Sequence, residues 1–241
     1  MTACAIVMVH GGQHTNRCWD PTVDAIRAIN PAVQVLAVNL PGHGDQPGDL
    51  ATLTVEQCAQ SVVDQIQAAG IQRVLLVGHS MAGITLPKVA EKLGADVVQK
   101  MLFVACCIPP NGGTVFGTLQ QPMRFIAGLW ARNVSVSPPL SPRIAKWIFA
   151  NGATPQQQAK MVECLCPESA TIGHERIDRS RMPAIPKAWV LTLRDRALRP
   201  KLQRRFIDNL GGVDEIIELD TSHDAMISEP EKLARIILSS L

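Results

Sequence analysis

The sequence predicts an α/β fold, in which a doubly wound, mostly parallel sheet of about six strands carries an inserted helical lid. Short apolar, β-branched runs alternate with amphipathic helical patterns, and this order is typical of parallel strands joined by right-handed helical crossovers. Most of these runs are apolar throughout, as expected for strands covered on both faces. One long interval breaks the alternation and predicts the lid.

The expected elements follow the apolar pattern in chain order. Thr54 and Gln57 are spaced as a capping box, which marks the start of the second helix. The six expected strands are residues 5–9, 33–38, 74–77, 101–105, 188–193 and 215–219. The helices expected between and after them are residues 19–29, 55–69, 84–93, 200–209 and 231–238.

The interval that breaks the pattern, residues 109–186, is rich in proline and contains no convincing strand. It leaves the sheet after the fourth strand, at the edge where open α/β sheets bind ligands. We therefore expect residues 1–108 and 187–241 to form the core and 109–186 to form the lid. Helical fragments are expected at residues 122–131, 142–150 and 155–166. Large apolar side chains of the lid either line a substrate pocket or only attach the lid to the core: Met123, Phe125, Trp130 and Trp147.

Bulk composition excludes several classes of function. The formal net charge is only +2 and no basic run occurs, so neither nucleic acid nor an anionic membrane is an expected partner. No apolar stretch is long enough to cross a bilayer. The sequence contains no Gly-Lys-Ser/Thr phosphate loop, no His-Glu-x-x-His helix and no cysteine cluster with zinc spacing, so no cofactor or metal is expected.

The seven cysteines indicate the compartment. Their odd number and scattered spacing, together with the lack of a recognisable secretory signal, favour reduced thiols and a cytoplasmic protein. A homodimer is compatible with the composition, which predicts no oligomeric state.

Residues 74–83 contain the candidate nucleophile. An apolar run ends at Gly78, Ser80 stands between small residues, and a helical pattern follows. This order predicts a strand, a sharp turn and a helix, which together expose the serine hydroxyl and leave backbone N–H groups free at the helix N-terminus. Since a free hydroxyl is a poor nucleophile, a base, an acid and an oxyanion site are required elsewhere.

The base and the acid are expected from loops that follow later strands. His223 comes after the last strand, and Asp195 ends the strand before it. Both positions lie at the carboxyl edge of a parallel sheet, where Ser80 also lies, and the chain order serine, aspartate, histidine suits this arrangement. Asp220 and Asp224 are too near His223 in sequence to present a carboxylate easily to its ring.

The oxyanion site is expected from backbone N–H groups. Gly11 and Gly12 follow the first strand, where glycine allows the backbone to approach a ligand closely. We expect the N–H groups of Gly12 and Met81 to bind the developing oxyanion.

These motifs resemble the α/β-hydrolases, and among them the branch of methylesterases and hydroxynitrile lyases. The resemblance rests on five segments that run nearly end to end: 9–12 with His14 and Trp19, 40–44, 78–81, 191–195 and 222–230. It implies the α/β-hydrolase fold and a cofactor-free serine carboxylesterase with the triad Ser80, Asp195 and His223. Gly11 and His14 are expected to contact the substrate, a small and largely apolar ester or lactone.

Three positions depart from the resembled pattern. Ala82 replaces the usual glycine two residues after the nucleophile, and alanine is small enough to be tolerated. Lyases of this branch carry threonine at the position of Gly11 and lysine at the position of Asp224, so both residues weigh against cyanohydrin cleavage. Asp224 is expected to raise the pKa of His223 by stabilising its imidazolium form. A lyase with the same triad and a poorly hydrolytic ligand receptor remain the alternatives.

Overall fold

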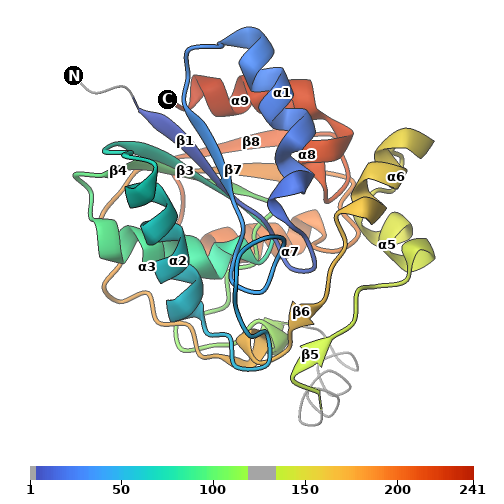
Figure 1. The fold of residues 1–241 in the computed structure, drawn as a ribbon, viewed down its shortest axis with the longest axis horizontal. Helices are drawn as coiled ribbons and strands as arrows, with labels where there is room; N and C mark the ends of the chain where they lie inside the picture. Colours follow the sequence, from blue (N-terminus) through green and yellow to red (C-terminus); the bar gives the residue numbers. More distant parts are fainter. Residues whose placement is uncertain (1–3, 119–133) are drawn as a thin grey trace.

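A parallel six-stranded sheet forms the centre of the molecule (Figure 1). The computed structural model describes residues 4–118 and 134–241. The strands lie in the order β2-β1-β3-β4-β7-β8, and every neighbouring pair is parallel. The predicted α/β class and the parallel sheet of six strands are therefore confirmed. The bounds of the strands are β1 Ala5–Val9, β2 Val35–Val38, β3 Val74–His79, β4 Val98–Val104, β7 Lys187–Thr192 and β8 Glu215–Leu219.

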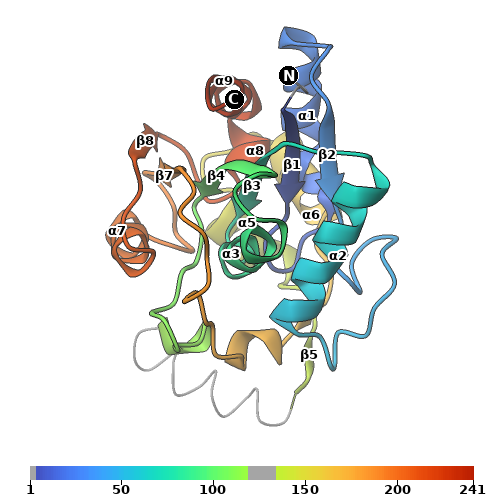
Figure 2. The ribbon, with the colours of Figure 1, turned by 90° about the vertical axis from the view of Figure 1, so that its left-hand side faces the viewer.

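Helices cover both faces of this sheet (Figure 2). One layer consists of α2, α3 and α7, and the other of α1, α8 and α9. The expected capping box at the start of α2 is present, with Thr54 accepting from the N–H of Gln57. The bounds of these helices are α1 Asp20–Ile29, α2 Val55–Ala68, α3 Ala82–Leu93, α7 Pro200–Asn209, α8 Ala225–Ser228 and α9 Pro230–Ser239.

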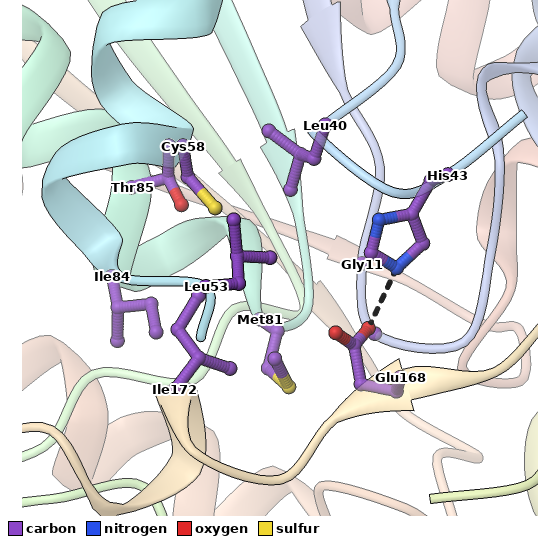
Figure 3. Close-up of a pocket in the computed structure, with 11 residues that line it drawn as sticks. Gly11, Leu40, His43, Leu53, Cys58, Met81, Ile84, Thr85, Glu168 and Ile172 are labelled. Atoms are coloured by element: carbon purple, nitrogen blue, oxygen red, sulfur yellow. Dashed lines mark hydrogen bonds and ion pairs between the residues drawn. The ribbon is translucent and has the colours of Figure 1, made fainter. Parts of the chain in front are cut away.

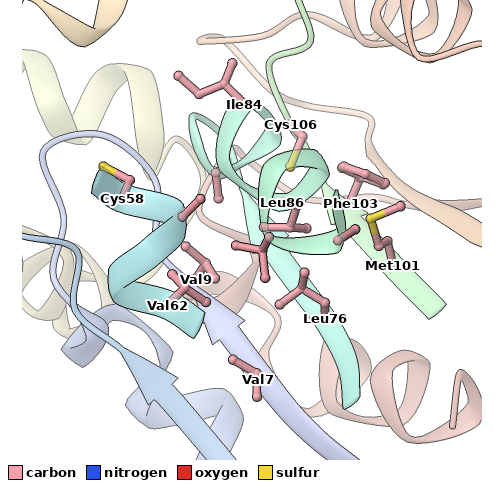
Figure 4. Packing of buried hydrophobic residues seen from close by; sticks show 14 of the residues in the cluster. Val7, Val9, Cys58, Val62, Leu76, Ile84, Leu86, Met101, Phe103 and Cys106 are labelled. Carbon is pink, nitrogen blue, oxygen red and sulfur yellow. The ribbon is translucent and has the colours of Figure 1, made fainter. Parts of the chain in front are cut away.

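The two cores explain why the strands are apolar throughout. In β3, Val74 and Leu76 face α2 and α3, whereas Leu75 and Val77 face the opposite helical layer. Figure 4 shows Leu76 in the first of these cores, together with Leu86 of α3 and Val62 of α2. Since successive side chains of a strand point to opposite faces, a strand between two helical layers needs apolar residues at both parities.

The strand β4 begins three residues before the expected start at Met101. Its first residue, Val98, pairs with Val74 of β3. Gln99 and Lys100 interrupt the apolar run, so the pattern alone places the start too late. Pairing with the neighbouring strand, and not hydropathy, extends β4 toward the N-terminus.

The predicted lid contains two of the expected helices and one unexpected ribbon. α5 (Pro142–Phe149) and α6 (Pro155–Glu163) match two predicted fragments, and the third, residues 122–131, lies outside the described residues. The expectation that no strand occurs in 109–186 is wrong, because β5 (Val136–Ser137) pairs antiparallel with β6 (Glu168–Ser169). Two-residue strands are too short to show an alternating pattern. The division into a core and a lid stays a prediction.

Within residues 4–118 and 134–241, no helix combines the length and the apolar character that crossing a membrane requires. The expectations that the chain binds no nucleic acid, lies in the cytoplasm and can form a homodimer stay predictions.

Gly83 provides a test of the packing around the turn that follows β3. A Cβ at Gly83 would lie 2.5 Å from the carbonyl oxygen of Cys107 and 3.0 Å from the Cβ of Cys106. Because the nearest atom belongs to the backbone, Gly83→Ala should lower the free energy of unfolding by about 3 kcal/mol, as measured by urea denaturation. Gly117→Ala is the control, since Gly117 is exposed and should change stability by less than about 0.5 kcal/mol. Equal effects of the two substitutions would contradict this account.

Candidate active site

Ser80 lies in a sharp turn between β3 and α3. Its φ is +51°, a left-handed conformation that non-glycine residues rarely adopt. Three backbone hydrogen bonds hold the turn: the N–H of Ser80 donates to Val104 (3.1 Å), and its carbonyl accepts from Gly83 (3.1 Å) and Cys107 (2.8 Å). The strand–turn–helix geometry expected from the sequence is therefore present, and the neighbouring strand and its following loop fix it.

Asp195 and His223 reach Ser80 from loops at the same edge of the sheet. Asp195 follows β7 and His223 follows β8, and both are buried. The Nδ1 of His223 donates to Asp195 Oδ2 at 2.7 Å, and its Nε2 lies 2.9 Å from Ser80 Oγ. The three residues singled out in the sequence thus form one continuous hydrogen-bonded chain from carboxylate to hydroxyl.

Other groups donate hydrogen bonds to the Asp195 carboxylate, and the sequence pattern did not predict them. Asp195 Oδ2 accepts from the Thr192 hydroxyl (2.9 Å) and from Gln203 Nε2 (3.2 Å), and Oδ1 accepts from the N–H of Leu198 (2.7 Å). Gln203 is fully buried on α7. A glutamine within the strongly amphipathic pattern of residues 200–209 carries no sequence signal for this role, because an exposed helix face also contains glutamine.

Two backbone N–H groups beside Ser80 are free. In the part of the chain that the structure describes, neither Gly12 N–H nor Met81 N–H has a hydrogen-bond acceptor. One hydrogen bond restrains the peptide group that contains the Gly12 N–H: the carbonyl of Gly11 accepts from His10 Nδ1 at 2.8 Å. His10 Nε2 in turn accepts from the N–H of Leu40. Burial and the nearby charge of His43 lower the pKa of His10 to about 3, so the ring stays neutral and keeps this tautomer.

A cavity of about 650 Å³ opens onto Ser80, Met81, Gly12 and His223. A volume of this size is ordinary for a small-molecule site. The wall is mainly apolar and comes largely from residues 109–186, the predicted lid: Val115, Phe116, Leu140, Ile144, Phe149 and Ala170.

A much smaller cavity lies behind the loop that carries Gly11 and Gly12 (Figure 3). Its volume is about 10 Å³, close to the space that one water molecule needs. His43, Met81 and Glu168 form part of its wall, and Figure 3 shows the Glu168 carboxylate directed at the His43 ring.

The residues expected to contact substrate have different surroundings. His14 lines the large cavity, but its Nδ1 donates to the carbonyl of Gly12 (2.9 Å) and its Nε2 contacts Asp224, so no ring nitrogen is free. Of the two cavities described above, Gly11 borders the small one and not the large one. Trp147 is 61 % exposed and lies against Arg196, whose guanidinium carbon is 5.2 Å from the ring centre. Met123, Phe125 and Trp130 lie outside the described residues.

The position of Trp147 shows where helical periodicity fails. The pattern located α5 correctly, but α5 contributes Ile144 and Phe149 to the cavity, not Trp147. In α5 only Ala145 is buried, so the face that turns inward depends on packing against segments far away in the sequence, which periodicity does not specify.

Asp224 is completely buried and lies among three histidines. Its Oδ2 accepts from His14 Nε2 at 3.1 Å, and its Oδ1 lies 3.8 Å from His79 Nε2 without a hydrogen-bond partner among the described residues. Burial raises the pKa of Asp224, but the charge and hydrogen bond of His14 outweigh it, and the net pKa is lowered. The pKa of His14 shifts in the opposite direction. Burial lowers it, but the charge and hydrogen bond of Asp224 raise it, and the net pKa is raised.

The pKa of His223 depends on both aspartates. Burial lowers it, the charge and hydrogen bond of Asp195 raise it, and the charge of Asp224 raises it again. The net pKa lies above the ordinary value of 6.5. The direction of the Asp224 contribution agrees with the expectation from the sequence.

The same cluster has the spacing of a three-ligand metal site. Ligand atoms of His79, His223 and Asp224 lie within 4.8 Å of one another. Both ring nitrogens of His223 are already hydrogen-bonded, one to Asp195 and one to Ser80, and His79 Nε2 donates to the carbonyl of His223 at 3.1 Å. The ring nitrogens of His223 and the Nε2 of His79 are therefore engaged in hydrogen bonds and are not preorganised to bind an ion.

The fold and this site define an α/β-hydrolase. Residues 6–236 match the model of the alpha/beta hydrolase family, so the chain belongs to that family. It is 26 % identical to the probable esterase PIR7A of Oryza sativa subsp. indica, over 96 % of this chain and 94 % of that protein. It is also 26 % identical to the pyrethroid hydrolase of Sphingobium wenxiniae, over 98 % of this chain and 87 % of the relative.

Solved structures show the same fold. An extracellular α/β-hydrolase from a Paenibacillus species, described as sharing homology with tobacco salicylic acid binding protein 2, superimposes with a TM-score of 0.86. The two are 23 % identical, and the match covers 98 % of each chain. The resemblance to the methylesterase branch is thereby confirmed, and the names of the relatives agree with the ester-hydrolase class expected from the sequence.

The contribution of Asp224 can be measured on the ring of His223. Removing the carboxylate charge in Asp224→Asn should lower the pKa of His223, because the imidazolium form loses a neighbouring negative charge. An NMR titration of the ring resonances of His223 measures this pKa directly. Asp220→Asn, in the same loop but 72 % exposed and paired with Arg194, is the control and should leave the pKa unchanged. An unchanged or raised pKa in Asp224→Asn would refute the assignment.

Proposed function

We propose that this protein is a serine esterase that cleaves a largely apolar carboxylic ester or lactone through an acyl-enzyme intermediate. One observation carries the proposal: the hydrogen-bonded chain from Asp195 through His223 to Ser80 ends in an apolar cavity, beside two free backbone N–H groups. This combination supplies a nucleophile, a base, an orienting carboxylate and an oxyanion site in one place.

In the first half-reaction, Ser80 Oγ attacks the ester carbonyl carbon while His223 Nε2 accepts its proton. The carbonyl oxygen becomes an oxyanion that the N–H groups of Gly12 and Met81 bind, and losing one such donor costs about 3 kcal/mol of transition-state stabilisation. Asp195 keeps the Nδ1–H tautomer and stabilises the imidazolium. When the intermediate collapses, the carbon–oxygen bond to the alcohol breaks and His223 gives its proton to the leaving alkoxide.

In the second half-reaction, a water molecule replaces the alcohol. His223 takes a proton from the water, the resulting hydroxide attacks the acyl carbon, and the same two N–H groups bind the second oxyanion. Collapse breaks the bond to Ser80 Oγ, returns the proton to the serine and releases the carboxylic acid.

The relatives and the cavity support an ester as substrate. Relatives of this chain are named esterase, methylesterase and pyrethroid hydrolase. The apolar wall of the cavity favours an uncharged substrate, and its volume leaves room for acyl or alcohol groups larger than acetate or methanol.

Lyase chemistry finds no support in the site. A Cβ at Gly11 would lie 2.8 Å from the Cβ of Ser80, so the threonine of the resembled lyases does not fit without a shift of the backbone. Asp224, which occupies the position of their lysine, is buried against His14 and does not line the cavity. No observation favours the receptor alternative.

Removing the nucleophile tests the mechanism. Ser80→Ala should lower kcat for hydrolysis of p-nitrophenyl butyrate by at least about 10³-fold, because the acyl-enzyme can no longer form. Cys107→Ala, a buried cysteine whose loop packs against the same turn, is the control and should keep most of the activity. Equal turnover by wild type and Ser80→Ala would exclude the proposed mechanism.

The length of the substrate's acyl chain provides a test of the apolar cavity. Each methylene group that moves from water into an apolar site contributes about 0.8 kcal/mol, so kcat/KM should rise by up to about fourfold per carbon from p-nitrophenyl acetate to the hexanoate. The measurement is initial rates with matched leaving groups. Flat or falling kcat/KM along this series would contradict an apolar acyl site.

A further inference from the structure

Side chains hold each peptide group of the loop from Gly11 to Gln13. The carbonyl of Gly11 accepts from His10 Nδ1 (2.8 Å) and the carbonyl of Gly12 accepts from His14 Nδ1 (2.9 Å). The N–H of Gln13 donates to Glu168 Oε2 (2.8 Å). Two successive glycines have high conformational freedom, so such external bonds are needed to keep the free N–H of Gly12 in one orientation.

The third of these anchors comes from the lid. Glu168 belongs to β6 and is 8 % exposed, which is unusual for a carboxylate unless it is paired. Its Oε1 accepts from the N–H of Ser169 (2.8 Å), and its Oε2 is shared by Gln13 and His43 Nε2 (3.3 Å, Figure 3). Burial lowers the pKa of His43, but the hydrogen bond and charge of Glu168 and the carbonyls of Pro41 and Leu40 outweigh it, so the net pKa is raised.

Gln13 connects the same loop to the other strand of the ribbon. Its φ is +60°, and its side chain donates to the carbonyl of Pro138 (3.1 Å) and accepts from the N–H of Leu140 (3.0 Å). Its own carbonyl accepts from the N–H of Cys166 at 3.0 Å. The residue after Gly12 is therefore bonded to the chain on both sides of the β5–β6 ribbon.

We propose that Glu168 is a positioning residue for the oxyanion hole. By accepting from the N–H of Gln13 it helps to hold Gly12 in place, so the N–H of Gly12 is correctly oriented only when the β5–β6 ribbon packs against this loop. The inference rests on the proposed esterase function. Glu168 does not act as an acid or base here, since both of its oxygens are engaged with backbone N–H groups and His43.

The negative charge of Glu168 and its hydrogen bond to Gln13 have different effects on the oxyanion hole. Its Oε2 would lie 3.4 Å from a Cβ on Gly12, so an unpaired carboxylate there would oppose a developing oxyanion. His43 contacts the same oxygen and offsets this charge. The hydrogen bond to Gln13, and not the charge, is therefore what the oxyanion hole requires.

Three variants separate these contributions. Glu168→Ala removes the acceptor, and Glu168→Gln keeps an acceptor without the charge. Glu175→Ala is the matched control, because Glu175 also comes from the predicted lid and accepts a core N–H, that of Val55 (2.7 Å), but at the start of α2. Pre-steady-state hydrolysis of p-nitrophenyl butyrate gives the rates of acylation and deacylation, and thermal unfolding monitors structure.

Both half-reactions pass through an oxyanion, so Glu168→Ala should slow acylation and deacylation by a similar factor, about 10-fold or more. Its affinity for an aryl trifluoromethyl ketone, which forms a tetrahedral adduct with Ser80, should fall by the same factor, while affinity for the unreactive amide analogue of the ester stays within twofold. Glu168→Gln should keep both rates within about threefold of wild type, and Glu175→Ala should change neither rate, although its Tm falls.

Other outcomes would overturn the inference. These are wild-type rates in Glu168→Ala, a loss confined to amide affinity, or equal loss in Glu168→Ala and Glu175→Ala. If the wild-type protein forms the ketone adduct through Ser80 but hydrolyses no ester, the proposed function is wrong, and the comparison of adduct affinities still decides the role of Glu168.

Discussion

The backbone conformation of Ser80 is the constraint on which the site depends. A positive φ at a residue with a side chain is maintained only where the surroundings impose it, and here the strand β4 and its following loop supply the hydrogen bonds that do so. The same turn requires small residues at Gly78 and Gly83, since a Cβ at either would lie within 2.6 Å of an existing atom. The Ser80 hydroxyl can therefore reach the ring of His223, and at the start of α3 the Met81 N–H has no acceptor among the residues that the structure describes.

Four buried histidines around this turn have pKa values shifted in different directions, and their surroundings set the difference. His10 has no acidic partner among the described residues and stays neutral, which its acceptor role toward the N–H of Leu40 requires. Burial and the charge of His223 lower the pKa of His79 well below the ordinary value. His14 and His223 each contact an aspartate, and their pKa values are raised. Two buried carboxylates thus raise the pKa of two of these four rings, and of the four it is His223 that is hydrogen-bonded to Ser80.

The predicted lid contributes more than a cover over the cavity. Its apolar residues form most of the cavity wall, so under the proposed function they decide which acyl and alcohol groups fit. Through Glu168 and Gln13 it is also bonded to the loop that carries the Gly12 N–H. Under the proposed function, the substrate cavity and the oxyanion hole therefore depend on the same segment of the chain.

Local sequence patterns determined the order of the secondary-structure elements and the turn at the candidate nucleophile. The strand and helix order, the capping box of α2 and the sharp turn at Ser80 follow from periodicity, glycine placement and short-range hydrogen bonding, all of which act over a few residues. The meeting of Ser80, Asp195 and His223 was also predictable, because parallel strands bring their carboxyl ends to one edge. Only the tertiary structure decided the rest. Three features arise from contacts between different segments of the chain: the hydrogen bond from Gln203 to Asp195, the hydrogen bond from Gln13 to Glu168, and the outward position of Trp147. Such contacts leave no periodic pattern in the sequence.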